Sequence, residues 1–319
     1  MPNIGIEYPE ARQMRFYDLA DPDPLEPDQI LIRTRYSAIT NGTERHALMG
    51  QFGWKKFPSR HGYQHVGIIE DVGNGVRDFK PGEWVFYGQY VGHRGWHVVE
   101  IDAHGRHLVL PLPGDVDHRC CALFGVAGVA SRGVQRFGIT AAQKVWVAGL
   151  GPIGQFAAQA ARAVGAHVTV TDVNEHRLSI AEQLGAHRAL NAADAHCTDA
   201  LQAGGPYNCI IDACGLESLL LDIHQARLLA HGGVIGCLAV RGNAVFPWSM
   251  LHGLEAAIEV SCHFTLDVLG IVLHFVQQGI IGIEPLVTHN VPINQAPDIY
   301  HTLRDRPADL LGVIFDWTD

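Results

Sequence analysis

Apolar and polar positions alternate over most of the first third of the chain, interrupted by glycine and proline turns. Residues 30–40, ILIRTRYSAIT, show the period of two that is typical of a half-buried strand, and the turn residues 41–43 follow. A short polar segment with helical character follows at 44–49. The remaining strand-like runs lie at 66–72, 84–87, 96–101 and 107–110. Turns such as Gly73-Asn74-Gly75 separate these runs, so we expect a β-meander.

From residue 120 the pattern changes to helices that alternate with short, bounded apolar runs. Helices are predicted at 120–136, 177–184 and 266–278, and strands at 145–148, 168–171, 208–213, 233–238 and 256–264. The tail, with expected elements at 285–291, 296–303 and 311–317, again resembles a meander. The chain is therefore predicted to be α/β, with a doubly wound parallel sheet in residues 126–265. This domain is inserted in a β-rich domain formed by residues 1–125 plus 266–319.

The stretch 144–172 carries the strongest local signal. It reads as strand, glycine turn, helix and second strand, with glycines at 149, 151 and 154. Gly149 permits the turn, Gly151 lets the backbone approach a pyrophosphate, and Gly154 lets helix and strand pack closely. Asp172 follows Gly154 by 18 positions, where a carboxylate can accept hydrogen bonds from an adenosine ribose. The pattern indicates a dinucleotide-binding unit.

The acid at the end of the second strand favours NAD(H) over NADP(H), because a carboxylate binds the free ribose 2′-hydroxyl and repels a 2′-phosphate. Arg177 is the nearby residue that could instead pair with a phosphate. The predicted cofactor-binding residues are Gly149, Gly151, Pro152, Ile153, Gly154, Asp172, Val173, Arg177, Ala213, Cys214, Leu238 and Ala239.

Composition narrows the possible partners. The 319 residues are 47% hydrophobic and 18% charged, which is typical of a soluble globular protein. A formal charge of -10 argues against nucleic acid, because phosphate backbones are bound by basic faces. No apolar run is long enough for a membrane span, and the N-terminal residues lack the parts of a signal peptide. We expect a cytoplasmic protein with reduced cysteines and a small-molecule substrate, but no membrane partner.

These residues together resemble the medium-chain dehydrogenase/reductase family. The resemblance is carried by the Asn-Gly-Thr-Glu turn at 41–44, the segment 62–85, the dinucleotide unit and residues 285–317. It implies a Rossmann domain inserted in a GroES-like catalytic domain, and a homodimer or homotetramer. Within the family, residues 41–44 and 62–63 look most like the subgroup of the bacteriochlorophyllide hydroxyethyl dehydrogenase.

The positions that hold zinc in other members are changed here. The resemblance assigns Cys to the position of Asn41, His to Tyr63, Glu to Gln64 and a further Cys or Glu near Gly125. Amides, a phenol and a glycine are poor zinc ligands. The lobe of four cysteines that binds structural zinc is also missing, with only residues 88–96 in its place. We expect no metal. Other candidate ligands lack a trustworthy spacing, namely Glu44, His46, His61 and His65.

The proton relay of the family is kept in the sequence. The resemblance implies that Thr43 and His46 pass the substrate proton to solvent through the cofactor ribose. We predict that Tyr63 and Thr43 hold the substrate oxygen, that His46 relays its proton, and that Asn41 and Gln64 orient the oxygen by their amides. Structural roles are the alternatives: Thr43 as a helix cap before Glu44, His46 as a surface residue, Tyr63 as a core aromatic and Gln64 as a turn residue.

The predicted function is zinc-independent, NAD(H)-dependent interconversion of a secondary hydroxyl and a ketone. The subgroup resemblance suggests a large, cyclic or polyol-like small molecule as substrate. One alternative is an NAD(P)H-dependent reductase of quinones or activated C=C bonds, which needs no relay for a hydroxyl proton. Another alternative is a dinucleotide-binding protein without turnover.

Overall fold

The structure is a computed structural model that describes residues 3–53, 56–102, 104, 106–241 and 243–318. The chain forms two compact units. The first contains the residues up to 125 together with 265–273 and those from 283 onward, and the second contains 126–264 and 274–282. The C-terminal part therefore joins the N-terminal part in one unit, and residues 274–282 belong to the other.

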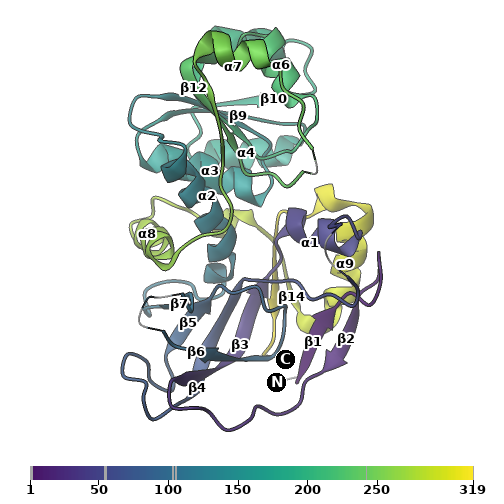
Figure 1. The fold of residues 1–319 in the computed structure, drawn as a ribbon, viewed down its shortest axis with the longest axis vertical. Coiled ribbons are helices and arrows are strands. Elements are labelled where there is room, and N and C mark those ends of the chain that lie inside the picture. The colour runs from purple at the N-terminus through teal and green to yellow at the C-terminus, as the bar shows by residue number, and fades with distance from the viewer. Residues whose placement is uncertain (1–2, 54–55, 103, 105, 242, 319) are drawn as a thin grey trace. The chain divides into compact units, whose positions relative to one another are not determined.

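The first unit is built on antiparallel β-structure (Figure 1). A two-stranded sheet pairs β1 (Ile4–Glu7) with β2 (Arg15–Asp18). In the larger sheet the order is β14-β15-β3-β4-β5-β7, and β6 also pairs with β3. Its strands are β3 (Gln29–Ala38), β4 (His65–Val72), β5 (Trp84–Tyr87), β6 (Trp96–Glu100), β7 (Val109–Pro111), β14 (Val287–Pro292) and β15 (Gly312–Asp316).

The expected meander is found in β3, β4 and β5, which pair antiparallel in chain order. The later strands depart from it, because β6 pairs with β3 and β7 pairs with β5. One expectation for this unit was wrong. The tail is not a meander, because β14 and β15 are parallel and α9 (Ala296–Asp305) connects them. Parallel neighbours need a crossover connection, and the helix provides it.

The second unit has a parallel sheet with the order β10-β9-β8-β11-β12-β13 (Figure 1). Its strands are β8 (Lys144–Ala148), β9 (His167–Asp172), β10 (Arg188–Asn191), β11 (Tyr207–Asp212), β12 (Leu229–Cys237) and β13 (Ala257–Val260). The order reverses between β8 and β11, as in a doubly wound Rossmann sheet. The predicted fold class, a Rossmann sheet with a GroES-like β-rich domain, is confirmed.

The helices follow the predicted pattern, with additions. A 3₁₀ turn at Cys120–Leu123 precedes α2, and three short 3₁₀ turns lie near the C-terminus at Glu284–Leu286, Ile293–Gln295 and Pro307–Asp309. The α-helices besides α9 are α1 (Asn41–Leu48), α2 (Phe124–Arg136), α3 (Pro152–Ala163), α4 (Glu175–Gln183), α5 (Cys197–Gly204), α6 (Leu219–Gln225), α7 (Trp248–Leu254) and α8 (Leu266–Gln277). Among the described helices, none is long and apolar enough to span a bilayer.

Each unit has its own core. In the first, Ile39, Tyr300, Phe315 and Trp317 belong to one fully buried cluster, which joins α9 and β15 to the residue that follows β3. In the second, Trp146, Ile210 and Ile235 pack from adjacent strands. Apolar strands that are buried on both faces are typical of a sheet covered by helices, which explains the short, continuous apolar runs of the sequence.

Candidate active site

The glycine turn of the second unit has the geometry of a phosphate-binding turn. β8 ends at Ala148, Gly149 has a φ of +94°, and α3 begins at Pro152 directly after Gly151. A Cβ at Gly154 would lie 1.9 Å from the Gly149 carbonyl oxygen, so only glycine fits there. A Cβ at Gly151 would have no neighbour within 4 Å, which leaves room beside the first N–H groups of the helix.

Asp172, at the end of β9, holds this turn in place. Its Oδ2 accepts a 2.7 Å hydrogen bond from the Leu150 N–H, and its Oδ1 accepts a 2.9 Å bond from the Asn174 N–H. Arg177 approaches the same carboxylate, with Nη1 4.0 Å from Oδ2, whereas Val173 is exposed. Asp172 thus has a structural role in addition to the predicted ribose contact.

A buried carboxylate that the sequence analysis missed organises the neighbouring loops. Asp212, fully buried at the end of β11, accepts hydrogen bonds at Oδ1 from the N–H groups of Gly215 (2.8 Å) and Cys214 (3.2 Å). Its Oδ2 forms an ion pair with Arg241, which lies beyond β12. No sequence pattern predicts this pair, because the two residues become neighbours only through the pairing of β11 with β12.

The other predicted cofactor residues gather at the carboxyl ends of these strands. Ala213 donates its N–H to the Ala148 carbonyl (3.0 Å), and Leu238 and Ala239 donate theirs to the Asp212 carbonyl (3.0 and 3.1 Å). A Cβ on Gly149 would lie 2.7 Å from the Cβ of Cys214. Open parallel sheets bind their ligands at this edge. The open space at Gly151 and the carboxylate of Asp172 fit a nicotinamide dinucleotide, which would carry the hydride chemistry.

In the first unit, the two predicted amides are anchored by backbone contacts. Asn41 donates from Nδ2 to the carbonyls of Leu310 (3.1 Å) and Leu311 (3.0 Å). Gln64 donates from Nε2 to the Ala38 carbonyl (3.3 Å) and to Thr40 Oγ1 (3.2 Å). Each amide nitrogen has two hydrogens, and both are used in each case. Neither amide therefore has a donor left for a substrate oxygen.

Tyr63, Gln64 and Gly125 lie side by side. The Tyr63 side chain is 2% exposed, and its ring centroid lies 4.5 Å from that of Tyr90. A Cβ at Gly125 would lie 2.5 Å from Gln64 Cγ and 2.8 Å from Tyr63 Cε2. The tyrosine and glutamine side chains thus fill the space that a side chain at position 125 would need.

Thr43 and His46 lie on α1, three positions apart, so they project from one face of the helix. Both are partly exposed, and the His46 ring meets the Phe52 ring edge-on at 4.5 Å. The helix begins earlier than expected, at Asn41, with Thr40 as its N-cap. The alternative that Thr43 caps a helix beginning at Glu44 was therefore wrong.

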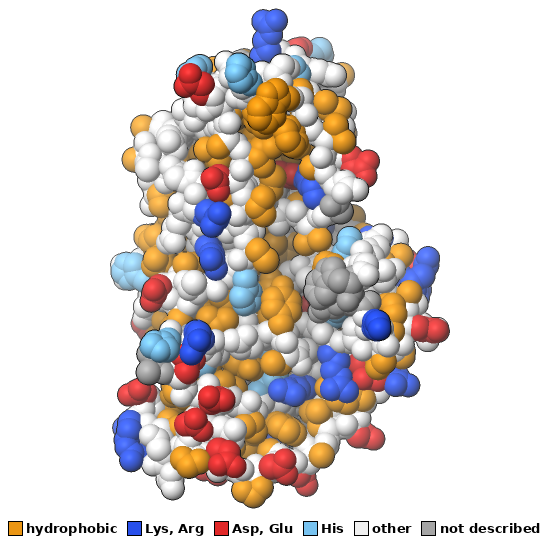
Figure 2. Space-filling model, in the orientation of Figure 1, with side chains coloured by type: hydrophobic (Ala, Val, Ile, Leu, Met, Phe, Trp, Pro, Cys, Tyr) orange, Lys and Arg blue, Asp and Glu red, His pale blue; other side chains and the backbone are white. Residues whose placement is uncertain are grey.

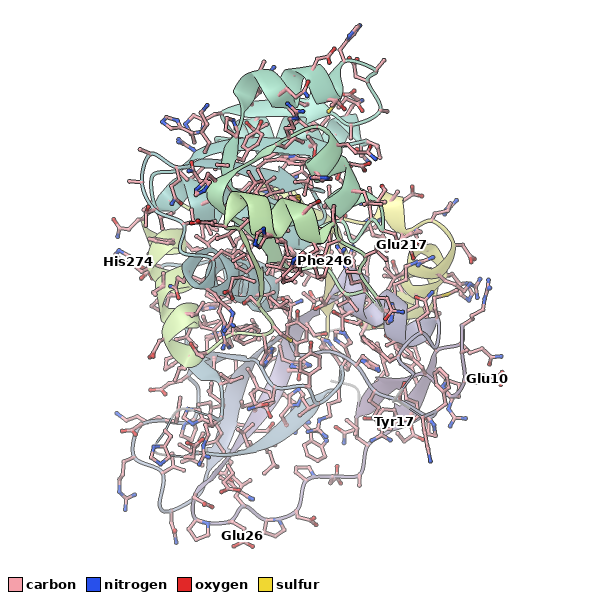
Figure 3. All side chains as sticks on the ribbon, turned by 45° about the horizontal axis from the view of Figure 1, so that its top comes forward. Glu10, Tyr17, Glu26, Glu217, Phe246 and His274 are labelled. Carbon is pink, nitrogen blue, oxygen red and sulfur yellow. The ribbon has the colours of Figure 1, made fainter. Side chains whose placement is uncertain are left out.

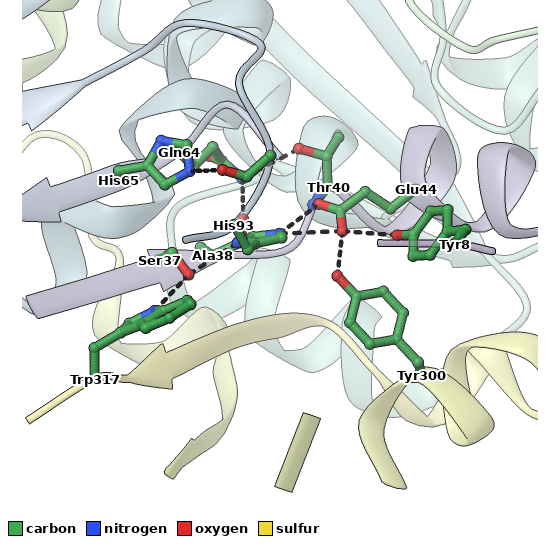
Figure 4. Close-up of polar contacts among 11 residues, drawn as sticks. Tyr8, Ser37, Ala38, Thr40, Glu44, Gln64, His65, His93, Tyr300 and Trp317 are labelled. Atoms are coloured by element: carbon green, nitrogen blue, oxygen red, sulfur yellow. Dashed lines mark hydrogen bonds and ion pairs between the residues drawn. The ribbon is translucent and has the colours of Figure 1, made fainter. Parts of the chain in front are cut away.

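Glu44 is the centre of a buried polar network on the inner side of α1 (Figure 4). Its carboxylate accepts hydrogen bonds from Tyr300 Oη (2.7 Å), Tyr8 Oη (3.4 Å) and the Thr40 N–H (2.8 Å), and His93 Nε2 lies 3.2 Å away. Burial raises the pKa of Glu44, but His93 and these hydrogen bonds outweigh it and hold the pKa below its usual value. The site helix is thereby anchored to three other segments.

The network continues from His93 to the C-terminal strand. His93 Nδ1 lies 2.8 Å from Ser37 Oγ, which accepts a 2.9 Å hydrogen bond from Trp317 Nε1 (Figure 4). Ser37 thus joins His93 to Trp317, so the network extends from α1 to the C-terminal residues. On the basis of the sequence, Glu44 was considered only as a possible metal ligand. The capping box has its acid three residues after the N-cap, whereas Glu44 follows Thr40 by four, so that pattern did not predict the hydrogen bond to the cap N–H.

Comparison with known proteins agrees with both units. Residues 26–148 match the model of the alcohol dehydrogenase GroES-like domain, and residues 152–277 match that of the zinc-binding dehydrogenases. The L-threonine 3-dehydrogenase of Shewanella pealeana is 26% identical over 332 aligned positions, covering 91% of this chain and 92% of that protein. The chain belongs to the medium-chain dehydrogenase/reductase family. It is accordingly a nicotinamide-dependent oxidoreductase that acts on the CH–OH/C=O couple.

Solved structures share the fold of this family member over nearly its whole length. A short-chain alcohol dehydrogenase of Escherichia coli CFT073 in complex with NADH has a TM-score of 0.85 at 20% identity, covering 98% of this chain and 99% of that one. A zinc-binding dehydrogenase of Sinorhizobium meliloti 1021 bound to NADP has a TM-score of 0.82 at 20% identity, covering 98% of both chains. The two neighbours differ in cofactor, so the fold alone does not distinguish NAD from NADP.

The four positions to which the resemblance assigns zinc ligands carry Asn41, Tyr63, Gln64 and Gly125, whose side chains are poor ligands for zinc. Within the described ranges, no group of three or more His, Cys, Asp or Glu side chains is arranged to bind a metal ion. Two of the four alternative ligands are engaged elsewhere: Glu44 is the centre of the network described above, and His65 Nδ1 and Nε2 lie 3.3 and 3.1 Å from the carbonyls of Tyr87 and Gly92. Burial holds the pKa of His65 well below its usual value, so this ring stays neutral.

Proposed function

We propose that this dehydrogenase interconverts a secondary hydroxyl and a ketone on a cyclic or polyol-like small molecule, with NAD(H) and without zinc. The observation that carries the proposal is the packing around Gly125. Tyr63 and Gln64 occupy the space in which a ligand at position 125 would have to lie, and both amide hydrogens of Gln64 are used. Side chains that fill the space of a site and donate hydrogen bonds to the protein are poorly suited to bind a metal ion.

The charge of the developing alkoxide must then be stabilised by hydrogen-bond donors. Because Asn41 and Gln64 donate to the protein itself, we assign this role to the hydroxyls of Tyr63 and Thr43. Packing against Tyr90 restricts the Tyr63 ring, which keeps its hydroxyl in one place. Asn41 retains a buried Oδ1 that has no hydrogen-bond partner among the described residues, and this atom can accept a hydrogen bond from a substrate hydroxyl.

His46 completes the proposed proton path. An imidazole gains and loses its proton near neutral pH, so a partly exposed one can exchange a proton between a bound alcohol and water. Thr43 lies one helical turn before it, on the same face of α1. Retention of both side chains favours an alcohol over a quinone or a C=C bond as substrate.

The preference for NAD(H) rests on Asp172. Its carboxylate lies at the end of β9, where a ribose 2′-hydroxyl is bound in Rossmann folds. Arg177, 4.0 Å from the carboxylate, is held by this negative charge and is less available to a 2′-phosphate. The proposal therefore predicts tighter binding of NADH than of NADPH.

The decisive experiment combines metal analysis with a substrate panel. The purified protein is assayed for zinc and then for NAD-linked oxidation of cyclic and polyol secondary alcohols, with and without EDTA, beside reduction of quinones and enones. We expect substoichiometric zinc and chelator-insensitive alcohol oxidation. Stoichiometric zinc, or activity that EDTA removes and zinc restores, would contradict the zinc-free mechanism. Turnover of quinones alone would favour the C=C or quinone reductase, and cofactor binding without any turnover would favour a non-catalytic role.

We also propose a homodimer or homotetramer. β13 is the end strand of the described parallel sheet, so one edge of its backbone has no neighbour there. Large hydrophobic side chains are exposed nearby in the chain: Val245 (69%), Phe246 (40%), Trp248 (71%) and Val260 (61%). Figure 2 shows hydrophobic side chains on the surface around α7, and Figure 3 labels Phe246 in the stretch before that helix. Sedimentation at several concentrations tests this, and a monomer throughout would contradict it.

A further inference from the structure

A cavity of about 480 Å³ lies in the first unit, on residues with no part in the proposed reaction. Its lining combines two arginines, a carboxylate, an amide and one aliphatic side chain: Asn3, Arg33, Arg35, Ile68 and Glu70. The arginines come from β3, Ile68 and Glu70 come from β4, and Asn3 directly precedes β1. Two adjacent guanidinium groups in one cavity suggest an anion as ligand.

One of the arginines is already neutralised. Arg33 donates from Nε to Glu70 Oε2 at 2.6 Å and from Nη2 to Glu70 Oε1 at 3.1 Å, which makes a bidentate pair. Its Nη1 donates to Asn3 Oδ1 at 3.3 Å. Hydrogen bonding from Arg33 holds the pKa of Glu70 below its usual value, so this carboxylate is charged. The pair contributes no net charge to the cavity.

Arg35 is different, because its buried Nε has no hydrogen-bond partner among the residues that the structure describes. Its charge adds to the effect of Arg33 on the pKa of Glu70, but it forms no bidentate pair with that carboxylate. The register of β3 against β4 shifts between Thr34 and Tyr36, so Arg35 is the extra residue of a β-bulge. Bulges re-aim side chains and are frequent next to functional sites. Arg35 lines the cavity, so a bound ligand can supply the acceptor that its buried Nε lacks.

We propose that the cavity binds a compact oxyanion, a phosphate or a carboxylate group, on a small hydroxylated molecule. The guanidinium group of Arg35 donates hydrogen bonds to the anion. Glu70 and Asn3 accept hydrogen bonds from the hydroxyl groups of the same molecule. The formal charge of -10 disfavours a polyanion such as nucleic acid, because the rest of the surface would repel it. This site is independent of the proposed active residues.

The test follows the Nε–H resonance of Arg35 by ¹⁵N NMR of the full chain during titration with three probes. Inorganic phosphate represents the free anion, glycerol 3-phosphate a phosphorylated polyol, and glycolate a hydroxy-carboxylate. We expect saturable shifts with a dissociation constant of about 1 mM or tighter for the best probe. The order of the three affinities identifies the ligand class. Glycerol 3-phosphate against glycolate compares phosphate with carboxylate, and glycerol 3-phosphate against inorganic phosphate shows whether the hydroxyl groups contribute. A local resonance also separates this site from anion binding at the glycine turn.

Two substitutions should change affinity in opposite directions. Arg35→Gln removes the guanidinium group and should weaken calorimetrically measured binding at least about tenfold. Glu70→Gln removes the competing negative charge and should strengthen binding, a gain that misfolding cannot imitate. Arg106→Gln, at an exposed arginine of the same unit, is the matched control and should change nothing. Absence of a saturable shift, or affinity that is equal in Arg35→Gln and the native chain, would overturn the proposal.

Discussion

The Tyr300 hydroxyl donates a 2.7 Å hydrogen bond to the carboxylate of Glu44, although the two residues lie 256 positions apart in the chain. Both side chains are buried, at 1% exposure each. Burial, and after it the charge of Glu44, raises the pKa of Tyr300 well above its usual value, so the phenol stays a donor. The C-terminal helix α9 thus holds the helix that carries Thr43 and His46.

Glu44→Gln should therefore destabilise the protein strongly. The substitution keeps the size of the side chain but leaves His93 and the two tyrosine hydroxyls without a charged acceptor. Loss of one partner from a buried ionic network typically costs about 3–5 kcal/mol. Urea unfolding measures the change, and Glu70→Gln, in a pair that is 47% exposed on the carboxylate side, is the control that should stay within about 1 kcal/mol. A Glu44→Gln variant as stable as the control would show that the network has no stabilising role.

The same network predicts that the free energy of unfolding falls at acid pH. The folded-state pKa of Glu44 is lowered from 4.5, so the folded protein holds this proton less tightly than the unfolded chain does. Its contribution is complete above about pH 4.5 and is lost as the pH falls through the lower folded-state value. The difference in unfolding free energy between the native chain and Glu44→Gln should accordingly shrink below about pH 4.5. A difference that grows in acid would contradict the sign.

Two glycines of the Rossmann turn should respond differently to alanine. Gly151 has a φ of -62° and a ψ of 178°, which alanine adopts readily, and its Cβ would have no neighbour within 4 Å. Gly151→Ala should melt within a degree or so of the native chain but bind NADH at least about tenfold more weakly, because the methyl occupies the pyrophosphate space. Gly154→Ala should lose both stability and binding, since its Cβ would lie 1.9 Å from the Gly149 oxygen. If Gly151→Ala binds NADH as tightly as the native chain does, the pyrophosphate does not lie beside Gly151.

The cofactor preference depends on a balance between Asp172 and Arg177. Fluorescence titration should show tighter binding of NADH than of NADPH by the native chain. Asp172→Ser should narrow that difference, because it removes the repulsion of a 2′-phosphate and leaves Arg177 without its carboxylate. Arg177→Gln should widen it by removing the nearby cation. Tighter NADPH binding by the native chain would be enough to reject the preference.

The features that could be predicted from the sequence are those set by residues close together in the chain. The glycine turn could be recognised because its constraints are local: Gly154 meets the Gly149 carbonyl only five positions away, and the helix begins two residues before Gly154. The strand order of the first unit could not be predicted in this way. The pairing of β6 with β3 joins residues 63 to 71 positions apart, and the alternating pattern is the same for every possible partner.

The polar interior of the first unit shows the same limit. Glu44, Tyr8, His93 and Tyr300 come from four separate segments, so no spacing along the chain reveals their contact. The roles of the Asn41 and Gln64 amides also depended on hydrogen-bond partners that are distant in the sequence. Asn41 has a donor set that suits a substrate oxygen, but the carbonyls of Leu310 and Leu311 take both hydrogens. Sequence identified the residue types, and only the tertiary contacts decided which atoms remain available.

Tyr63→Phe tests the mechanism directly. The substitution removes only the hydroxyl and keeps the ring that packs against Tyr90 and Gly125, so the fold should be unchanged. If the hydroxyl donates to the developing alkoxide, turnover of the best alcohol should fall by a factor of about 100 to 1,000 with little change in NADH affinity. Tyr90→Phe, in the ring that touches Tyr63, is the matched control and should keep its turnover. EDTA should leave both variants and the native chain unaffected. Full activity of Tyr63→Phe in zinc-free protein would make Tyr63 a packing residue, and the donor to the substrate oxygen would then have to be sought beside Thr43.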